Sequence, residues 1–155
     1  MMLQPPTAGF SVFEIKQALM RGAGGDHGTE SGLVLLMVGD WLPQLHRANL
    51  ITVEACLDGS CGDGPIAKLD WAVVAAALHE GRLAGSSGEL TVLRVAASLA
   101  HGLLVDLGEL AAGLDRQSIG AVQAAIAFAT YDPDVRRGII NDAADTGAAP
   151  PQGPA

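Results

Sequence analysis

Residues 86–102 read SSGELTVLRVAASLAHG and contain the main signals of a capped helix. Ser86 and Glu89 have the one–four spacing of a capping box, in which each side chain accepts a hydrogen bond from the other residue's backbone amide. Gly102 is placed to end the helix in a left-handed turn. Apolar residues recur between these signals at helical spacing, which predicts an amphipathic helix. Its inward positions are Leu90, Val92, Leu93, Ala96 and Leu99.

Further helices are predicted in the first third of the chain. Ser11 and Glu14 form a second capping box at the start of a helix. Residues 33–38 are hydrophobic on every helical face, which indicates deep burial. Asp40 can then cap a short helix with Pro43 in its first turn. The sequence leaves open whether Pro43 kinks one helix or separates two.

The periodicity changes after this helical region. Apolar and polar residues alternate from Ile51 to Leu57, which is typical of a half-buried strand. A glycine-rich turn over 58–65 follows, and residues 66–69 can return antiparallel. We therefore expect a small β-hairpin.

Asp70, Asp106 and Asp115 occupy the N-cap positions of three more predicted helices, the last of them over 116–130. Together the signals predict a mainly α protein, a compact bundle of about six to seven short helices with one small β-hairpin.

The chain has 155 residues, which suits a single domain. We expect an irregular lead-in over 1–10 and one helical domain over 11–140. Residues 141–155 are rich in Ala, Pro and Gly, and this composition predicts a disordered tail.

Charge and hydropathy exclude several function classes. The net charge of −8 argues against nucleic acid and anionic membranes as partners, because both attract basic surfaces. The mean hydropathy of +0.31 is high, yet the longest strongly apolar run, 33–38, is far shorter than the roughly 20 residues of a spanning helix. The N-terminus shows no signal-peptide pattern. We expect a cytoplasmic protein with no membrane partner.

Residues 119–129 form a predicted helix with almost no polar face. Either this helix is central to the core or another subunit covers its second face. This pattern favours a non-enzymatic interaction or regulatory module, self-associating or bound to a protein partner. The candidate interface residues are Ile119, Val122, Ile126 and Phe128.

Residues 106–130 also resemble a helix-turn-helix, which makes a DNA-binding transcriptional regulator the alternative function. Its second helix would present Arg116, Gln117, Ser118 and Gln123 to the major groove. This segment holds three acidic residues and one basic residue, a net charge of −2, whereas DNA readers neutralise several phosphates. A helical hairpin packed in the core accounts for the same pattern.

The residues that could support catalysis or metal binding are scattered. Cys56 and Cys61 form one close pair, whereas a structural zinc site usually needs four ligands. The histidines show no metal-binding spacing and no close pairing with a nucleophile. They are His27, His46, His79 and His101. We expect no catalytic residue, no cofactor and no metal, and therefore no enzyme.

The segment from about residue 66 to 130 resembles small helical proteins of actinobacteria and their phages, which have no assigned activity. Asp70-Trp71, Ser86-Ser87-Gly88-Glu89 and Gly113-Leu114-Asp115 are among the residues that carry the resemblance. It implies a helical fold and identifies no functional residue.

Overall fold

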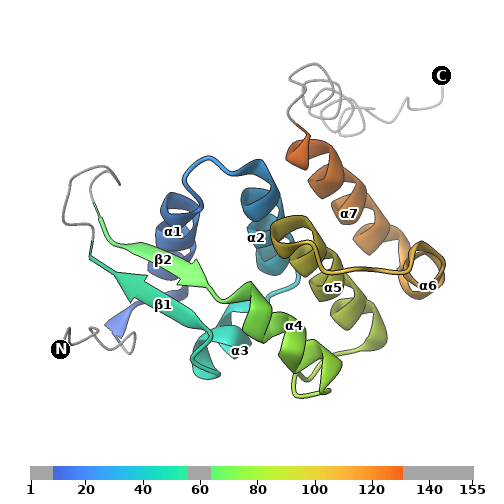
Figure 1. Ribbon diagram of the computed structural model, residues 1–155, viewed down its shortest axis with the longest axis horizontal. Helices are drawn as coiled ribbons and strands as arrows, with labels where there is room; N and C mark the ends of the chain where they lie inside the picture. The colour runs from blue at the N-terminus through green and yellow to red at the C-terminus, as the bar shows by residue number, and fades with distance from the viewer. Residues whose placement is uncertain (1–8, 56–63, 131–155) are drawn as a thin grey trace, which may run out of the picture.

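The computed structural model describes residues 9–55 and 64–130, and these contain seven helices and one two-stranded antiparallel sheet (Figure 1). The predicted fold class, a mainly α bundle with a small hairpin, is confirmed. The elements are α1 (Val12–Ala23), α2 (His27–Val38), α3 (Leu42–Arg47), β1 (Ile51–Glu54), β2 (Ile66–Leu69), α4 (Trp71–His79), α5 (Ser87–His101), α6 (Leu107–Gly113) and α7 (Arg116–Ala129). The tail predicted over 141–155 lies outside the described residues, as does most of the predicted lead-in over 1–10.

Five of the predicted helix starts are confirmed. Ser11 and Ser86 both form complete capping boxes with the glutamate three residues later. Asp70, Asp106 and Asp115 accept hydrogen bonds from backbone amides in the first turns of α4, α6 and α7. These caps recur because a short polar side chain before a helix satisfies amides that have no intrahelical acceptor.

The prediction that Asp40 caps a helix is wrong. Asp40 has a left-handed backbone, with φ of 54°, and α3 begins after Trp41 without a side-chain cap. The amide of Trp41 donates to Leu36 O (3.0 Å), which closes the end of α2 and places the indole in the core. Asp is one of the few residues that tolerate this conformation. Pro43 lies in the first turn of α3, so two helices are present where one kinked helix was possible.

The prediction that 33–38 is buried on every face is also wrong. Leu33, Leu35 and Leu36 are at most 2% exposed, but Val34 is 40% and Val38 60% exposed. Helix α2 packs against α1, α5 and α7, and these neighbours leave part of its circumference open. The helix is therefore central without being fully enclosed.

The described elements pack around α2 and α5. Helix α7 lies along both, α4 and α6 contact α5, and α1 covers one face of the hairpin. In the hairpin Ile51 pairs with Leu69 and Val53 with Ala67, and all four side chains are buried. The hairpin and α6 lie at opposite ends of the molecule (Figure 1).

No helix within the described ranges is long and apolar enough to cross a membrane.

Candidate interaction surface

Helix α7 divides the four predicted interface residues among three places. Val122 is 3% exposed and belongs to the core, where α7 packs on α2 and α5. Ile119 and Ile126 are 36% and 48% exposed. Phe128 stacks on His27 of α2, with ring centroids 6.2 Å apart and 27° between the ring planes. The apolar residues of α7 therefore do not share one face: some pack in the core and others are exposed on the surface.

Helix geometry separates these surface residues further. Ile119 and Ile126 are seven positions apart, so they lie on the same side of α7 two turns from each other. Phe128 is two positions beyond Ile126, roughly 200° further around the helix. Because Phe128 contacts α2, the Ile119–Ile126 side turns away from α2.

The most exposed leucines of the described chain precede α7. Leu104, in the link between α5 and α6, is 95% exposed, and Leu107, the first residue of α6, is 73% exposed. Helix α6 buries none of its residues. Leu104 lines a cavity of about 280 Å³ against α5, with Val105 and Leu110 as further apolar lining and Arg94, Thr91, Asp106 and Glu109 as polar lining.

Large exposed apolar side chains therefore concentrate in one part of the chain. Of the ten in the described residues, five lie between residues 104 and 128. Three of these five, Ile119, Ile126 and Phe128, were predicted from the sequence, whereas Leu104 and Leu107 were not. Leu104 lies between the helix stop Gly102 and the cap Asp106, and Leu107 directly follows that cap. This was the available signal, since a short link between two capped helices has little surface to pack against.

A second cavity, of about 330 Å³, opens where α2 ends and α5 and α7 begin, and we call it the α2–α7 cavity. Its polar lining comprises Asp40, Glu89, Gln117 and Ser118. Its apolar lining comprises Val38, Gly39, Val92 and Ala121.

This cavity also shows the surroundings of the predicted DNA-contact residues. Gln117 and Ser118 line it together with Asp40 and Glu89, while Arg116 and Gln123 are exposed elsewhere on α7. Arg116 is the sole basic residue of α6 and α7.

Helix α6 packs on α5, and α7 packs on α2 and α5, with few contacts between α6 and α7. Nothing in this arrangement supplies the cationic surface that phosphate contacts require.

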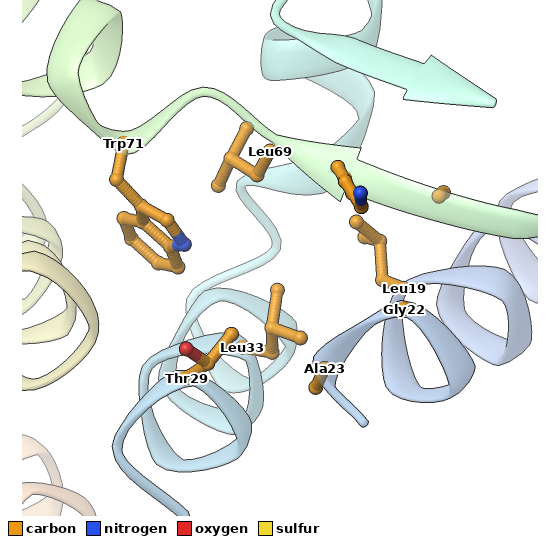
Figure 2. Close-up of a pocket in the computed structure, with 9 residues that line it drawn as sticks. Leu19, Gly22, Ala23, Thr29, Leu33, Leu69 and Trp71 are labelled. Carbon is orange, nitrogen blue, oxygen red and sulfur yellow. The ribbon is translucent and has the colours of Figure 1, made fainter. Parts of the chain in front are cut away.

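A smaller cavity of about 130 Å³ lies between α1, α2 and β2 (Figure 2). Leu19, Leu33, Leu69 and Trp71 point into it, and its charged lining is limited to Lys68. Thr29 and Lys68 are the polar residues of its lining, which includes no carboxylate, histidine or thiol to act beside them as a base or nucleophile.

The described residues hold no cluster of three His, Cys, Asp or Glu side chains that could bind a metal. Cys56 and Cys61 lie outside the described residues. The carboxyl groups of Glu14, Asp26 and Asp115 have lowered pKa values because each accepts hydrogen bonds at a helix start, from Ser11, Thr29 and Ser118 respectively. Helix capping accounts for these lowered pKa values without a catalytic role.

Searches with the chain found no matching protein-family model, no matching curated protein and no matching solved structure.

Proposed function

We propose that this protein is a non-enzymatic interaction module that self-associates through its C-terminal apolar residues. We define these as Leu104, Leu107, Ile119 and Ile126. The observation that carries the proposal is the exposure of Leu104, at 95%. Fully burying a leucine side chain is worth roughly 1.5–3 kcal/mol, so a contact that covers several of these exposed side chains would favour association.

The charge on α7 supports a second copy as the partner. The helix carries no acidic residue, and its single basic residue is Arg116 at its first position. Gln123 is the polar residue between Ile119 and Ile126 along the helix. Two α7 helices can therefore pack in a symmetric contact without placing like charges opposite each other. The net charge of −8 limits further, unspecific aggregation.

Light scattering after size exclusion tests this proposal on the full chain. We expect a dimer or larger assembly at tens of micromolar, and a dissociation constant at least roughly tenfold higher for the Leu104→Ser, Leu107→Ser double variant. Phe13→Ser is the matched control, because Phe13 is 69% exposed on α1 and lies outside the defined surface.

Two results would reject self-association through these residues. One is a wild-type chain that remains a monomer across the concentration range. The other is an assembly that the leucine variants and Ile126→Ser leave unchanged while circular dichroism shows intact folds.

A further inference from the structure

The α2–α7 cavity combines apolar walls with acidic residues. Val38, Val92 and Ala121 come from three different helices, and Val38 is 60% exposed. Asp40 and Glu89 line the same space. Its volume of about 330 Å³ is at the low end of the roughly 300–1,000 Å³ typical of ligand pockets, so one long side chain suits it better than a large ligand.

The carboxylates of this cavity lack cationic partners within the described residues. The ion pairs found there, Lys68 with Glu54 and Arg82 with Glu80, involve neither Asp40 nor Glu89. Glu89 accepts the Ser86 amide at 2.7 Å, and Asp40 accepts no hydrogen bond from a described residue. Both carboxylates can therefore receive an additional donor.

The partial charges of the helix ends around the cavity do not cancel the negative charge of Asp40 and Glu89. The starts of α5 and α7 each contribute a partial charge of roughly +0.5, and the end of α2 contributes roughly −0.5. Asp115 caps α7 next to the cavity, and Arg116 follows it. With all of these groups and the carboxylates of Asp40 and Glu89 counted, the local charge remains negative, which favours a cation.

The apolar surface continues beyond the cavity along α2. Val34 is 40% exposed and lies one turn before Val38, on the same side of the helix. Further along, the stack of His27 and Phe128 joins α2 to α7. A small amine would leave Val34 uncovered, whereas a peptide segment could fill the cavity and cover this apolar row.

We propose that the α2–α7 cavity docks a segment of a partner protein, with an arginine or lysine side chain in the cavity and an apolar side chain over Val34 and Val38. This surface is distinct from the C-terminal apolar residues, so its failure would leave self-association standing, and the reverse also holds.

Chemical-shift mapping with three capped probes tests the docking site on the full chain. The probes are acetyl-arginine amide, its neutral citrulline analogue, and the tetrapeptide acetyl-Leu-Ala-Ala-Arg amide. We expect saturable shifts at the amides of Val38, Gln117 and Ala121. Citrulline should bind at least roughly fivefold more weakly, and the tetrapeptide roughly tenfold more tightly than acetyl-arginine amide, because its leucine covers apolar surface.

Charge-neutralising variants complete the test without disturbing the backbone. Asn tolerates the left-handed conformation of Asp40, and Gln retains the capping role of Glu89. Asp40→Asn with Glu89→Gln should weaken arginine binding at least roughly fivefold, whereas Glu14→Gln, the same change in the other capping box, should not. The proposal is overturned if arginine and citrulline bind equally, if the double variant binds as wild type, or if the shifts map to Leu104 and Ile119.

Discussion

Individual glycines determine how closely the helices approach their neighbours. A Cβ built on Gly22 would lie 2.0 Å from the carbonyl oxygen of Ala67, where α1 meets β2. A Cβ on Gly32 would lie 2.7 Å from the carbonyl oxygen of Ala96, where α2 meets α5. In both cases the obstacle is backbone, which cannot rotate away as a side chain can. Glycine is required here by tertiary contact, although Gly32 lies inside a helix that alanine would favour locally.

Alanine substitutions at these glycines test this requirement. We expect Gly32→Ala to lower the free energy of unfolding by about 1–3 kcal/mol, and Gly22→Ala to lower it more, because the interfaces must separate to admit the methyl group. Gly120→Ala is the control, since no atom lies within 4 Å of its added Cβ and the helix gains about 1 kcal/mol in propensity. Urea denaturation measures all three. Equal effects at Gly32 and Gly120 would contradict the close contact.

At the scale of elements, aspartates at the N-caps couple helix formation to pH. Asp26 accepts hydrogen bonds from the hydroxyl and the amide of Thr29, and Asp115 accepts from the amide of Ser118 at 2.7 Å. These bonds favour the charged carboxylate and hold both pKa values below the ordinary 3.8. The stabilisation is complete above the unfolded-state pKa and is lost as the pH falls through the lower folded-state pKa.

The Asp26→Asn, Asp115→Asn double variant should therefore be less sensitive to acid. Asparagine caps helices about as well as aspartate but cannot be protonated in this range. We expect the melting temperature of the variant to fall less than that of the wild type between about pH 5 and about pH 2. Thermal melts across this range measure the difference. Identical slopes for the two proteins would show that the caps are not responsible.

At the scale of the whole molecule, burial is distributed unevenly between similar elements. Helices α2 and α5 form the centre and supply Leu36, Leu93 and Ala96, all 0% exposed. Helix α3 has six residues and buries Leu42 and Leu45, whereas α6 has seven and buries none. Regions with few buried contacts open at low free energy, so length alone does not determine local stability.

Hydrogen exchange should reveal this distribution. We expect the slowest amide exchange in α2 and α5, and faster exchange in α6 than in the shorter α3, because opening α6 exposes no buried side chain. Exchange followed by mass spectrometry at monomer and assembly concentrations makes the measurement. If α6 becomes protected only in the assembly, the result also supports self-association there. Equal protection of α6 and α5 in the monomer would contradict the burial described above.

Much of the fold could be predicted because its signals are local. The two capping boxes, the aspartate caps of α4, α6 and α7, and the alternation that marks β1 all depend on residues within a few positions of each other. The cap at Asp26 is equally local, but the glycines around it, at positions 22, 24, 25 and 28, are atypical of a helix and obscure the start of α2.

The candidate site was predictable only in part, because apolar character does not indicate which face is covered. Val122 and Ile126 lie one turn apart on α7, yet the first is in the core and the second is exposed. Val34 and Leu35 are adjacent in the sequence, yet Val34 is exposed and Leu35 is buried.

The sequence by itself determined the starts of α1, α4, α5, α6 and α7 and the end of α5 at Gly102, because a cap joins a side chain to amides two or three residues away. The tertiary structure alone decided that Asp40 adopts a left-handed turn, that Val38 stays open beside Ala121, and that Gln117 shares a cavity with acidic residues from two other segments. Burial and cavities depend on which surfaces meet across long sequence separations, and a local pattern carries no information about the surface that packs against it.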